Sequence, residues 1–368
     1  MVENINNMNN DRNKKQKHSD LLFLILLITF IAGVAVFNYI IDPYYIFRDS
    51  TIKTVNNVKT HKYSNKRTII YSDIKINSKN KNIAFTGNCL LSHYGSGLDN
   101  VGFFTIPVAK VEEVAQIIKN LHLLAPDVKK IYWGLFYDDF WNTKNDEVND
   151  TLKTLDKKIV TLQDFVNLFF SWNTTKYSIE TLRDSIKNGG KDIIYVYPYR
   201  EIAKKTYNKE FTYESIETVK EIVDFAKENN IELVIYYSPI HVSKKVHIYK
   251  KGMWESNQEL KRRLAQITPF YDYSLFNEFN YLPINENNFD FIDNIHPTNS
   301  YNNKIVYDLL DENKKIGTLV NADNVNVLLK EDTKQLESYI KENKEICEKI
   351  ENVKIEDAEI AIRRVDAI

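Results

Sequence analysis

The chain lacks a surplus of charge of either sign, and it contains very little cysteine. Its 368 residues include 49 Lys and Arg against 50 Asp and Glu, and two cysteines, Cys89 and Cys347. The charge balance argues against a basic surface for nucleic acid or for an acidic membrane, so no nucleic-acid partner is expected. Two cysteines are too few for a disulfide framework or a cysteine-based zinc site, and a single disulfide between them stays open.

The sequence also lacks an internal repeat, a phosphate-binding glycine loop and a cluster of metal ligands. Neither a cofactor nor a metal ion is therefore expected. Aromatic residues, by contrast, make up 12% of the chain and include 23 tyrosines, which is enough for a packed core and argues against global disorder. The length fits one sizeable domain with appendages.

One long uncharged apolar run extends from Leu21 to Ile41. It has the length that a helix needs to cross a bilayer, and the basic residues between Arg12 and Lys17 favour a cytoplasmic N-terminus. No Ala-x-Ala-like cleavage site follows, so the run predicts an uncleaved anchor, with a buried core helix as the alternative. We therefore expect a single-pass protein of the cell membrane whose main domain, after Asp42, is extracytoplasmic.

Strand-like and helix-like patterns alternate through the rest of the chain. Short apolar runs predict strands, and apolar residues at helical spacing predict helices between them. The predicted strands are 81–87, 128–137, 192–197, 231–239 and 271–276, and the predicted helices are 108–124, 161–172, 178–186, 213–230, 257–267 and 299–312. This alternation favours an α/β fold with a central parallel sheet covered on both faces. Chemistry in such sheets gathers beyond the carboxyl ends of the strands.

Two short motifs carry the candidate chemistry. Cys89 follows the predicted first strand after a Gly87-Asn88 turn, where a helix start would lower the pKa of the thiol and favour the thiolate. Asp293 and His296 form an Asp-x-x-His motif, in which the carboxylate can fix the tautomer of a histidine base. A histidine base beside a thiol is the arrangement of an activated nucleophile.

These two motifs resemble those of SGNH/GDSL-type hydrolases. Gly87-Asn88-Cys89 stands where that family has Gly-Asp-Ser, and Asp293-x-x-His296 matches its terminal Asp-x-x-His block. The layout is similar to bacterial membrane-anchored SGNH-like proteins of cell-envelope polysaccharide loci, relatives of the teichoic-acid D-alanyl transfer and alginate acetylation proteins. The further stretches that fit this layout are 37–47, 236–241, 252–264, 270–279 and 321–329.

The residue patterns and the resemblance together predict a domain organisation. The patterns predict a cytoplasmic segment at 1–20, an anchor at 21–41, a juxtamembrane arm at 42–80 and a helical C-terminal extension at 316–368, and the resemblance implies an SGNH-like three-layer extracytoplasmic domain at 81–315.

The resemblance also implies an activity, namely transfer of an acyl group, with acetyl as the leading candidate, to a cell-envelope glycan, or hydrolysis of such an ester. Cys89 would attack the acyl carbon, His296 would shuttle the proton and Asp293 would orient His296. A multi-spanning membrane O-acyltransferase would be the partner that supplies the acyl group.

The chain also departs from the family at three places. Cysteine replaces the nucleophilic serine, no glycine lies between Phe103 and Lys110, and no asparagine lies between Trp133 and Trp141. The last two stretches should supply oxyanion donors, each contributing about 3 kcal/mol to transition-state stabilisation. The alternative is therefore a catalytically degenerate domain that binds glycan or acts as a scaffold, and whether the chain is an enzyme stays open.

The remaining polar residues have weaker functional interpretations. Ser92 would lie one turn too late for a nucleophile, His93 is expected at the surface, and His241 either lines the site or packs at a strand end. Asp138 and Asp139 are interpreted as loop charges, because adjacent side chains project apart. The short basic run from Lys261 to Arg263 is interpreted as the solvated face of a helix.

Overall fold

The computed structural model divides the chain into two compact units. One contains residues 1–64 and 160–191, and the other contains 65–159 and 192–368. The residues that the structure describes are 2–44, 47, 52–57, 66–88, 98–106, 109–140, 166, 168–187, 189, 192–196, 213–281, 290–291, 295–314, 316–352 and 361–365.

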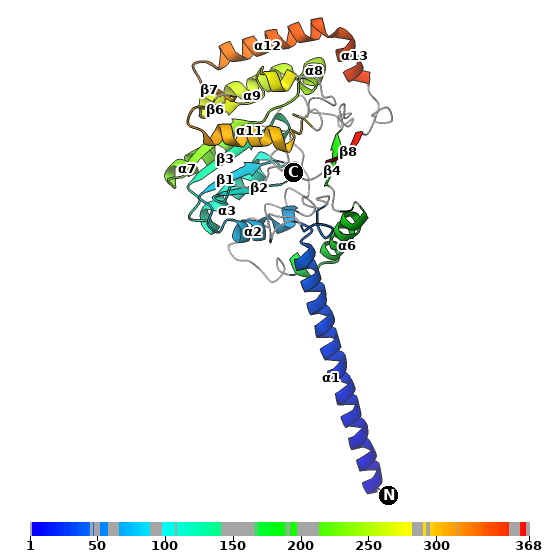
Figure 1. Ribbon diagram of the computed structural model, residues 1–368. Helices are drawn as coiled ribbons and strands as arrows, with labels where there is room; N and C mark the ends of the chain where they lie inside the picture. The colour runs from blue at the N-terminus through cyan, green and yellow to red at the C-terminus, as the bar shows by residue number, and fades with distance from the viewer. Residues whose placement is uncertain are drawn as a thin grey trace. The chain divides into compact units, whose positions relative to one another are not determined.

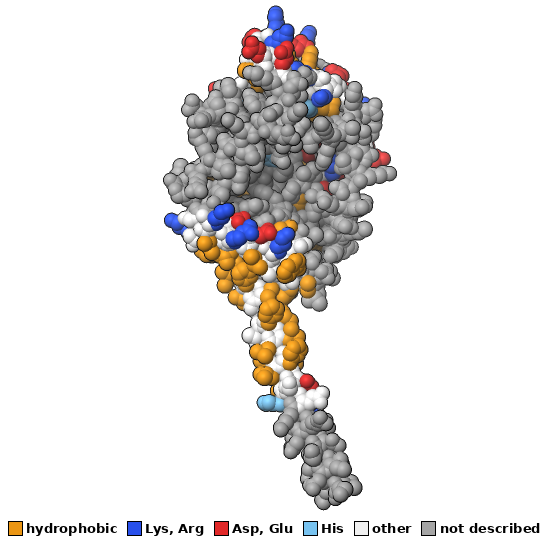
Figure 2. All heavy atoms as spheres, turned by 90° about the vertical axis from the view of Figure 1, so that its right-hand side faces the viewer, with side chains coloured by type: hydrophobic (Ala, Val, Ile, Leu, Met, Phe, Trp, Pro, Cys, Tyr) orange, Lys and Arg blue, Asp and Glu red, His pale blue; other side chains and the backbone are white. Residues whose placement is uncertain are grey.

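The first unit is built on the long helix α1, which spans Val2–Ile41, and on α6, which spans Trp172–Lys187. The part of α1 from Gln16 to Ile41 is long and apolar enough to cross a membrane, and none of its most apolar window is buried in the protein. Figure 2 shows apolar side chains covering this stretch of α1. This exposure contradicts the alternative of a buried core helix, whereas the direction in which α1 crosses a membrane stays a prediction.

The second unit contains a six-stranded, mostly parallel sheet in the order β2-β1-β3-β5-β6-β7 (Figure 1). The five strands from β2 to β6 are parallel, and β7 pairs antiparallel with β6. The strands span Ile83–Gly87 (β1), Val101–Thr105 (β2), Lys130–Leu135 (β3), Glu232–Tyr237 (β5), Phe270–Asp272 (β6) and Thr318–Val320 (β7). The expectation of an α/β fold with a central parallel sheet is thus confirmed.

Side chains alternate between the two faces of the sheet, as the two-residue period of a strand requires. On β3, Ile131, Trp133 and Leu135 join the larger apolar cluster, and Tyr132 points to the other face. The larger cluster includes side chains of α2 (Lys66–Asn77), α3 (Val111–Leu124), α7 (Tyr213–Glu228) and α9 (Trp254–Ile267). The other face packs aromatic strand residues against α11 (Asn299–Leu310).

Several elements were not predicted from the sequence, namely α2, β2, β7, the helix α8 (Val242–Lys250) and two short helical turns, η2 (Tyr137–Phe140) and α10 (Glu278–Tyr281). The predicted strand at 192–197 exists as β4 (Asp192–Val196), but it pairs antiparallel with β8 (Ala361–Val365) in a separate two-stranded sheet. It is therefore not a strand of the central sheet.

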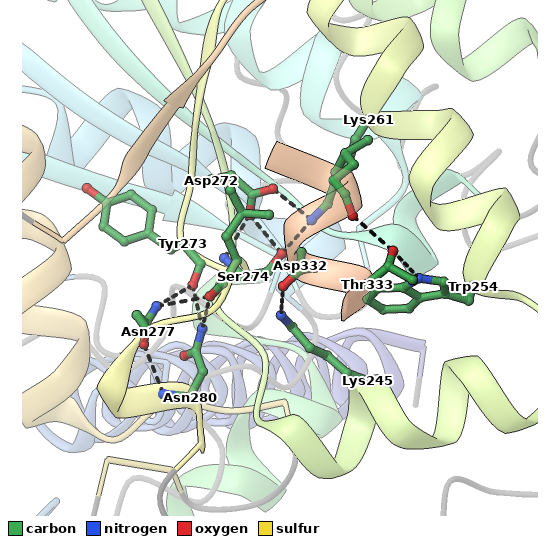
Figure 3. Close-up of polar contacts among 12 residues, drawn as sticks. Lys245, Trp254, Lys261, Asp272, Tyr273, Ser274, Asn277, Asn280, Asp332 and Thr333 are labelled. Carbon is green, nitrogen blue, oxygen red and sulfur yellow. Dashed lines mark hydrogen bonds and ion pairs between the residues drawn. The ribbon is translucent and has the colours of Figure 1, made fainter. Parts of the chain in front are cut away.

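Within the second unit, the C-terminal residues pack through β7, α12 (Val325–Glu342) and α13 (Lys344–Asn352). Lys245 on α8 forms an ion pair with Asp332 on α12 at 2.6 Å, and both side chains are buried (Figure 3). Trp254 at the start of α9 also donates from Nε1 to Thr333 Oγ1 at 3.0 Å. These contacts fix α12 against α8 and α9.

A second buried ion pair corrects one prediction. Lys261 on α9 does not lie on a solvated face, since its side chain is 1% exposed. Its Nζ contacts Asp272 Oδ2 at 2.7 Å and donates to Ser274 Oγ at 2.7 Å (Figure 3). A charged amine is stable in such a position only when its partners compensate for the lost water, and the carboxylate at the end of β6 does this.

Candidate functional site

The strand order defines one special point of the sheet. The chain runs from β1 outward to β2 and then crosses to β3 on the other side of β1, so the order reverses between β1 and β3. In open α/β sheets, ligands bind beyond the carboxyl ends of the strands at such a reversal. The described residues at this edge include Asn88 after β1, Lys110 after β2, and Asp138 and Asp139 after β3.

The turn after β1 begins at Gly87, whose φ is +149°. A residue with a Cβ rarely adopts this conformation, so glycine allows the chain to turn sharply where the strand ends. Asn88 follows with a buried side chain, and its Nδ2 donates to Asp139 Oδ1 at 2.8 Å. This hydrogen bond ties the turn after β1 to the segment after β3.

Asp139 is the centre of this contact, which corrects its interpretation as a loop charge. The 3₁₀ turn η2 directs its side chain inward, where Oδ2 accepts from the Phe136 backbone N–H at 2.8 Å. Its own N–H donates to the Phe136 carbonyl at 3.0 Å. Burial raises the pKa of Asp139 to about 8, although the Asn88 amide, Lys110 and the Phe136 N–H act in the opposite direction.

Two buried lysines approach the neighbouring residue Asp138. Lys110 donates from Nζ to the Asp138 carbonyl at 2.8 Å, and Lys244, on the first turn of α8, lies 3.5 Å from Asp138 Oδ2. Burial lowers the pKa of Lys110, while the nearby acidic residues, Asp139 first, raise it. Among the described residues, this edge therefore carries both lysines and aspartates rather than groups of one kind.

His241 begins α8 beyond the carboxyl end of β5. Its Nδ1 accepts from the Ser243 backbone N–H at 3.2 Å and lies 2.8 Å from Ser243 Oγ, so the histidine caps the helix. Its ring also packs against Phe291, with the ring centres 5.5 Å apart. His241 is thus a buried residue that connects the end of β5 to the segment containing Phe291.

This segment carries His296 to the same edge of the sheet. Phe291 and Pro297 form an antiparallel β-bridge, and His296 lies between Ile295 and Pro297 with a half-buried side chain. Because β1 and β5 are parallel strands, the turn at Asn88 and the loop at His241 lie at one edge. The Phe291–His241 contact therefore brings the His296 segment to the edge where Asn88 lies.

Four of the sequence-predicted residues, namely Cys89, Asp293, Ser92 and His93, lie outside the described residues. The Cys89–His296 dyad and its orientation by Asp293 stay predictions. Among the described residues, no group of three or more His, Cys, Asp or Glu side chains could hold a metal ion.

Sequence reasoning missed the roles of Asp139, Lys110 and Lys244, although their positions just beyond parallel strands or at a helix start were a usable signal.

Comparisons of the chain with protein-family models, with curated proteins and with solved structures find no match.

Proposed function

We propose that the chain is a membrane-anchored SGNH-like protein that handles acyl esters of a cell-envelope glycan. It would transfer an acyl group, with acetyl as the leading candidate, to a sugar hydroxyl, or it would hydrolyse such an ester. One observation carries the proposal: the Gly87-Asn88 turn, which lies beside the reversal of strand order, and the His296 segment, far apart in sequence, reach the same edge of the sheet. That is where an α/β sheet assembles a catalytic site.

The proposed reaction is a double displacement at the acyl carbon. Cys89 follows Asn88 directly, and its thiolate would form a bond from Sγ to the acyl carbon of the donor ester. His296 would take the thiol proton and give it to the departing alkoxide, so that a neutral alcohol leaves. His296 would then deprotonate a glycan hydroxyl or a water molecule, which attacks the thioester and restores the thiol.

Each partner has one role in this scheme. Asp293 would hold His296 in the tautomer that accepts the proton, and the glycan would supply the hydroxyl in a transfer reaction. A multi-spanning membrane O-acyltransferase would deliver the acyl donor across the bilayer that α1 would span.

The second candidate is a degenerate domain that binds glycan or acts as a scaffold, and one observation favours it. The segment after β3 presents Asp138 and Asp139 where the resemblance calls for an amide donor to the oxyanion. The Asn88 amide is already used to hold Asp139. Neither aspartate supplies the amide N–H that would stabilise a developing oxyanion, and the missing donor would reduce the rate.

Thiol reactivity distinguishes the two candidates. The full-length protein in detergent is labelled with iodoacetamide near neutral pH, with Cys347→Ser used to isolate Cys89. The enzyme proposal predicts fast labelling of Cys89 and slower labelling in His296→Ala. Cys347 is an internal control in the wild type, because it is buried and burial raises the pKa of its thiol. It should react slowly in either case.

Ester turnover completes the test with a chromogenic acetyl ester. We expect Cys89→Ser to retain part of the turnover, since serine is the residue of the family that the chain resembles, and Cys89→Ala to lose it. Slow labelling of Cys89, no effect of His296→Ala and no acyl-sulfur adduct would rule out catalysis at Cys89. Glycan binding that is unchanged in Cys89→Ala would then favour the binding role.

A further inference from the structure

The length of α1 predicts where its C-terminal end lies relative to a bilayer. The apolar run from Leu21 to Ile41 has 21 residues (41 − 21 + 1), which as a helix is about 31 Å long. This length matches the roughly 30 Å hydrocarbon core of a membrane. If α1 spans the membrane, its last turns, which include Asn38, lie at the boundary between the hydrocarbon and the headgroups.

The helix α6 is attached to this end of α1 within the same unit. Asn38 donates from Nδ2 to the Phe169 carbonyl at 2.8 Å and to Thr175 Oγ1 at 3.0 Å. Tyr44, just beyond α1, has its hydroxyl 3.0 Å from Thr174 Oγ1. Figure 1 shows α6 beside the C-terminal end of α1. The first turns of α6 therefore lie at the membrane boundary.

The burial of side chains on α6 is the reverse of that on a usual amphipathic helix. Its fully buried side chains are small and carry hydroxyl groups, whereas its large apolar side chains are exposed. The buried residues are Thr174, Ser178, Thr181 and Ser185, and the exposed ones are Trp172 at 76%, Ile179 at 52% and Ile186 at 61%. A helix of a water-soluble protein shows the opposite arrangement.

The three exposed apolar residues form one surface, which we call the α6 stripe. Trp172, Ile179 and Ile186 are spaced seven residues apart, so they lie on one face of the helix within about 40° of one another. Tryptophan is enriched at the level of membrane headgroups, because its ring is apolar and its N–H is polar. The stripe therefore has the composition of a surface that faces lipid.

Charged side chains border the α6 stripe. The basic residues Lys176, Arg183 and Lys187 are exposed, and two of them pair weakly with acidic neighbours, Lys176 with Glu180 at 4.0 Å and Arg183 with Asp184 at 3.1 Å. At the place of α6, Figure 2 shows orange apolar side chains below a row of blue and red charged ones, and the orange surface continues onto α1. An amphipathic helix in a membrane interface has this arrangement.

We propose that α6 is an interfacial helix whose α6 stripe inserts into the outer boundary of the bilayer that α1 crosses. The occupant of the stripe is lipid, because the stripe is continuous with the apolar surface of α1 and is bordered by residues that reach headgroups. The helix would hold the first unit at a fixed height and tilt on the membrane. The proposal depends on α1 spanning a bilayer, and it is independent of the proposed acyl chemistry.

The test measures which residues of α6 contact lipid in the full-length protein. Single cysteines are introduced as Ile179→Cys or Ile186→Cys in a Cys89→Ser/Cys347→Ser background, and they are labelled with an environment-sensitive fluorophore. Asn173→Cys is the matched control, because Asn173 is exposed on the same helix but outside the stripe. The protein is placed at one copy per nanodisc of phosphatidylglycerol and phosphatidylethanolamine, with or without a lipid-attached nitroxide quencher.

We expect the nitroxide to quench probes at 179 and 186 several-fold more strongly than the probe at 173, and aqueous iodide to show the reverse order. An unlabelled measurement repeats the test, since brominated lipid should quench a fluorescence component that Trp172→Phe removes. Iodide quenching at all three positions in single-copy discs would overturn the proposal. Protection of 179 and 186 only in discs with two copies would also overturn it, in favour of contact between two copies of the chain.

Discussion

The buried carboxyl group of Asp139 makes the stability of the protein depend on pH in a defined direction. Burial raises its pKa from 3.8 to about 8 in the folded protein. Between these two pH values the folded state keeps a proton on Asp139 that the unfolded state has lost. The free energy of unfolding must then fall as pH rises, because the folded state binds more protons. Above about pH 8 this contribution no longer changes.

The variant Asp139→Asn removes this titration and keeps the shape of the side chain. Its amide oxygen can accept from the Phe136 N–H, and its amide nitrogen can donate to Asn88 after the Asn88 side chain turns over. The difference in unfolding free energy, variant minus wild type, should grow by about 1.4 kcal/mol per pH unit. Between pH 5 and pH 7 it should therefore grow by about 3 kcal/mol.

The measurement is chemical unfolding of the full-length protein in detergent at several pH values between 5 and 7. Asp99→Asn is the matched control, because it makes the same substitution at an exposed position. Two other groups act on Asp139, namely Lys110, which lowers its pKa, and Asp138, which raises it. A difference curve that is flat or that declines over this range would show that Asp139 is ionised when folded, and it would refute the reasoning.

Two further predictions concern the stability of the fold. Gly87→Ala should lower the free energy of unfolding by about 1–3 kcal/mol, measured by thermal unfolding, because a Cβ is strained at a φ of +149°. The control Gly33→Ala, in the open surface of α1, should show no such loss. Asp332→Ala should lower the free energy of unfolding, measured by chemical unfolding, by roughly 3–5 kcal/mol, because it leaves the buried Lys245 without its carboxylate partner. The double variant Lys245→Met/Asp332→Leu should regain most of this loss. Equal stability of the single and double variants would contradict a buried ion pair.

The parallel part of the fold was predictable because its strands are short apolar runs between helices of suitable length. The strands β1, β3 and β5 follow this pattern, and so do the helices α3 and α7. The strand β2 (Val101–Thr105) was missed, although it has the same length as β1 and, like β1, contains a glycine. The helix α8 was missed because the inward face of Val242–Lys250 includes two lysines, which periodicity counts as exposed.

The candidate site was predictable in its position but not in its contacts. The carboxyl end of β1 follows from the run that ends at Gly87, and the position of Asn88 follows from that. The inward direction of Asp139 does not, since two adjacent carboxylates in a loop give no sign of which one is buried. Only the turn η2, which directs the Asp139 side chain inward to the Phe136 N–H and the Asn88 amide, decides this.

The local sequence likewise does not show which groups surround the helices α9 and α6. On α9, helical spacing places Lys261 on the same face as Trp254 and Leu264, and only its charge favoured solvent. Asp272 and Ser274, from β6 and its following loop, compensate for that charge. On α6, hydroxyl side chains are buried, and Ile179 and Ile186 are exposed. Periodicity gives the spacing of a face, but not whether a carboxylate, water or lipid lies against it. The surroundings of each helix are set by segments distant in the chain: the end of β6 for α9, and the end of α1 for α6.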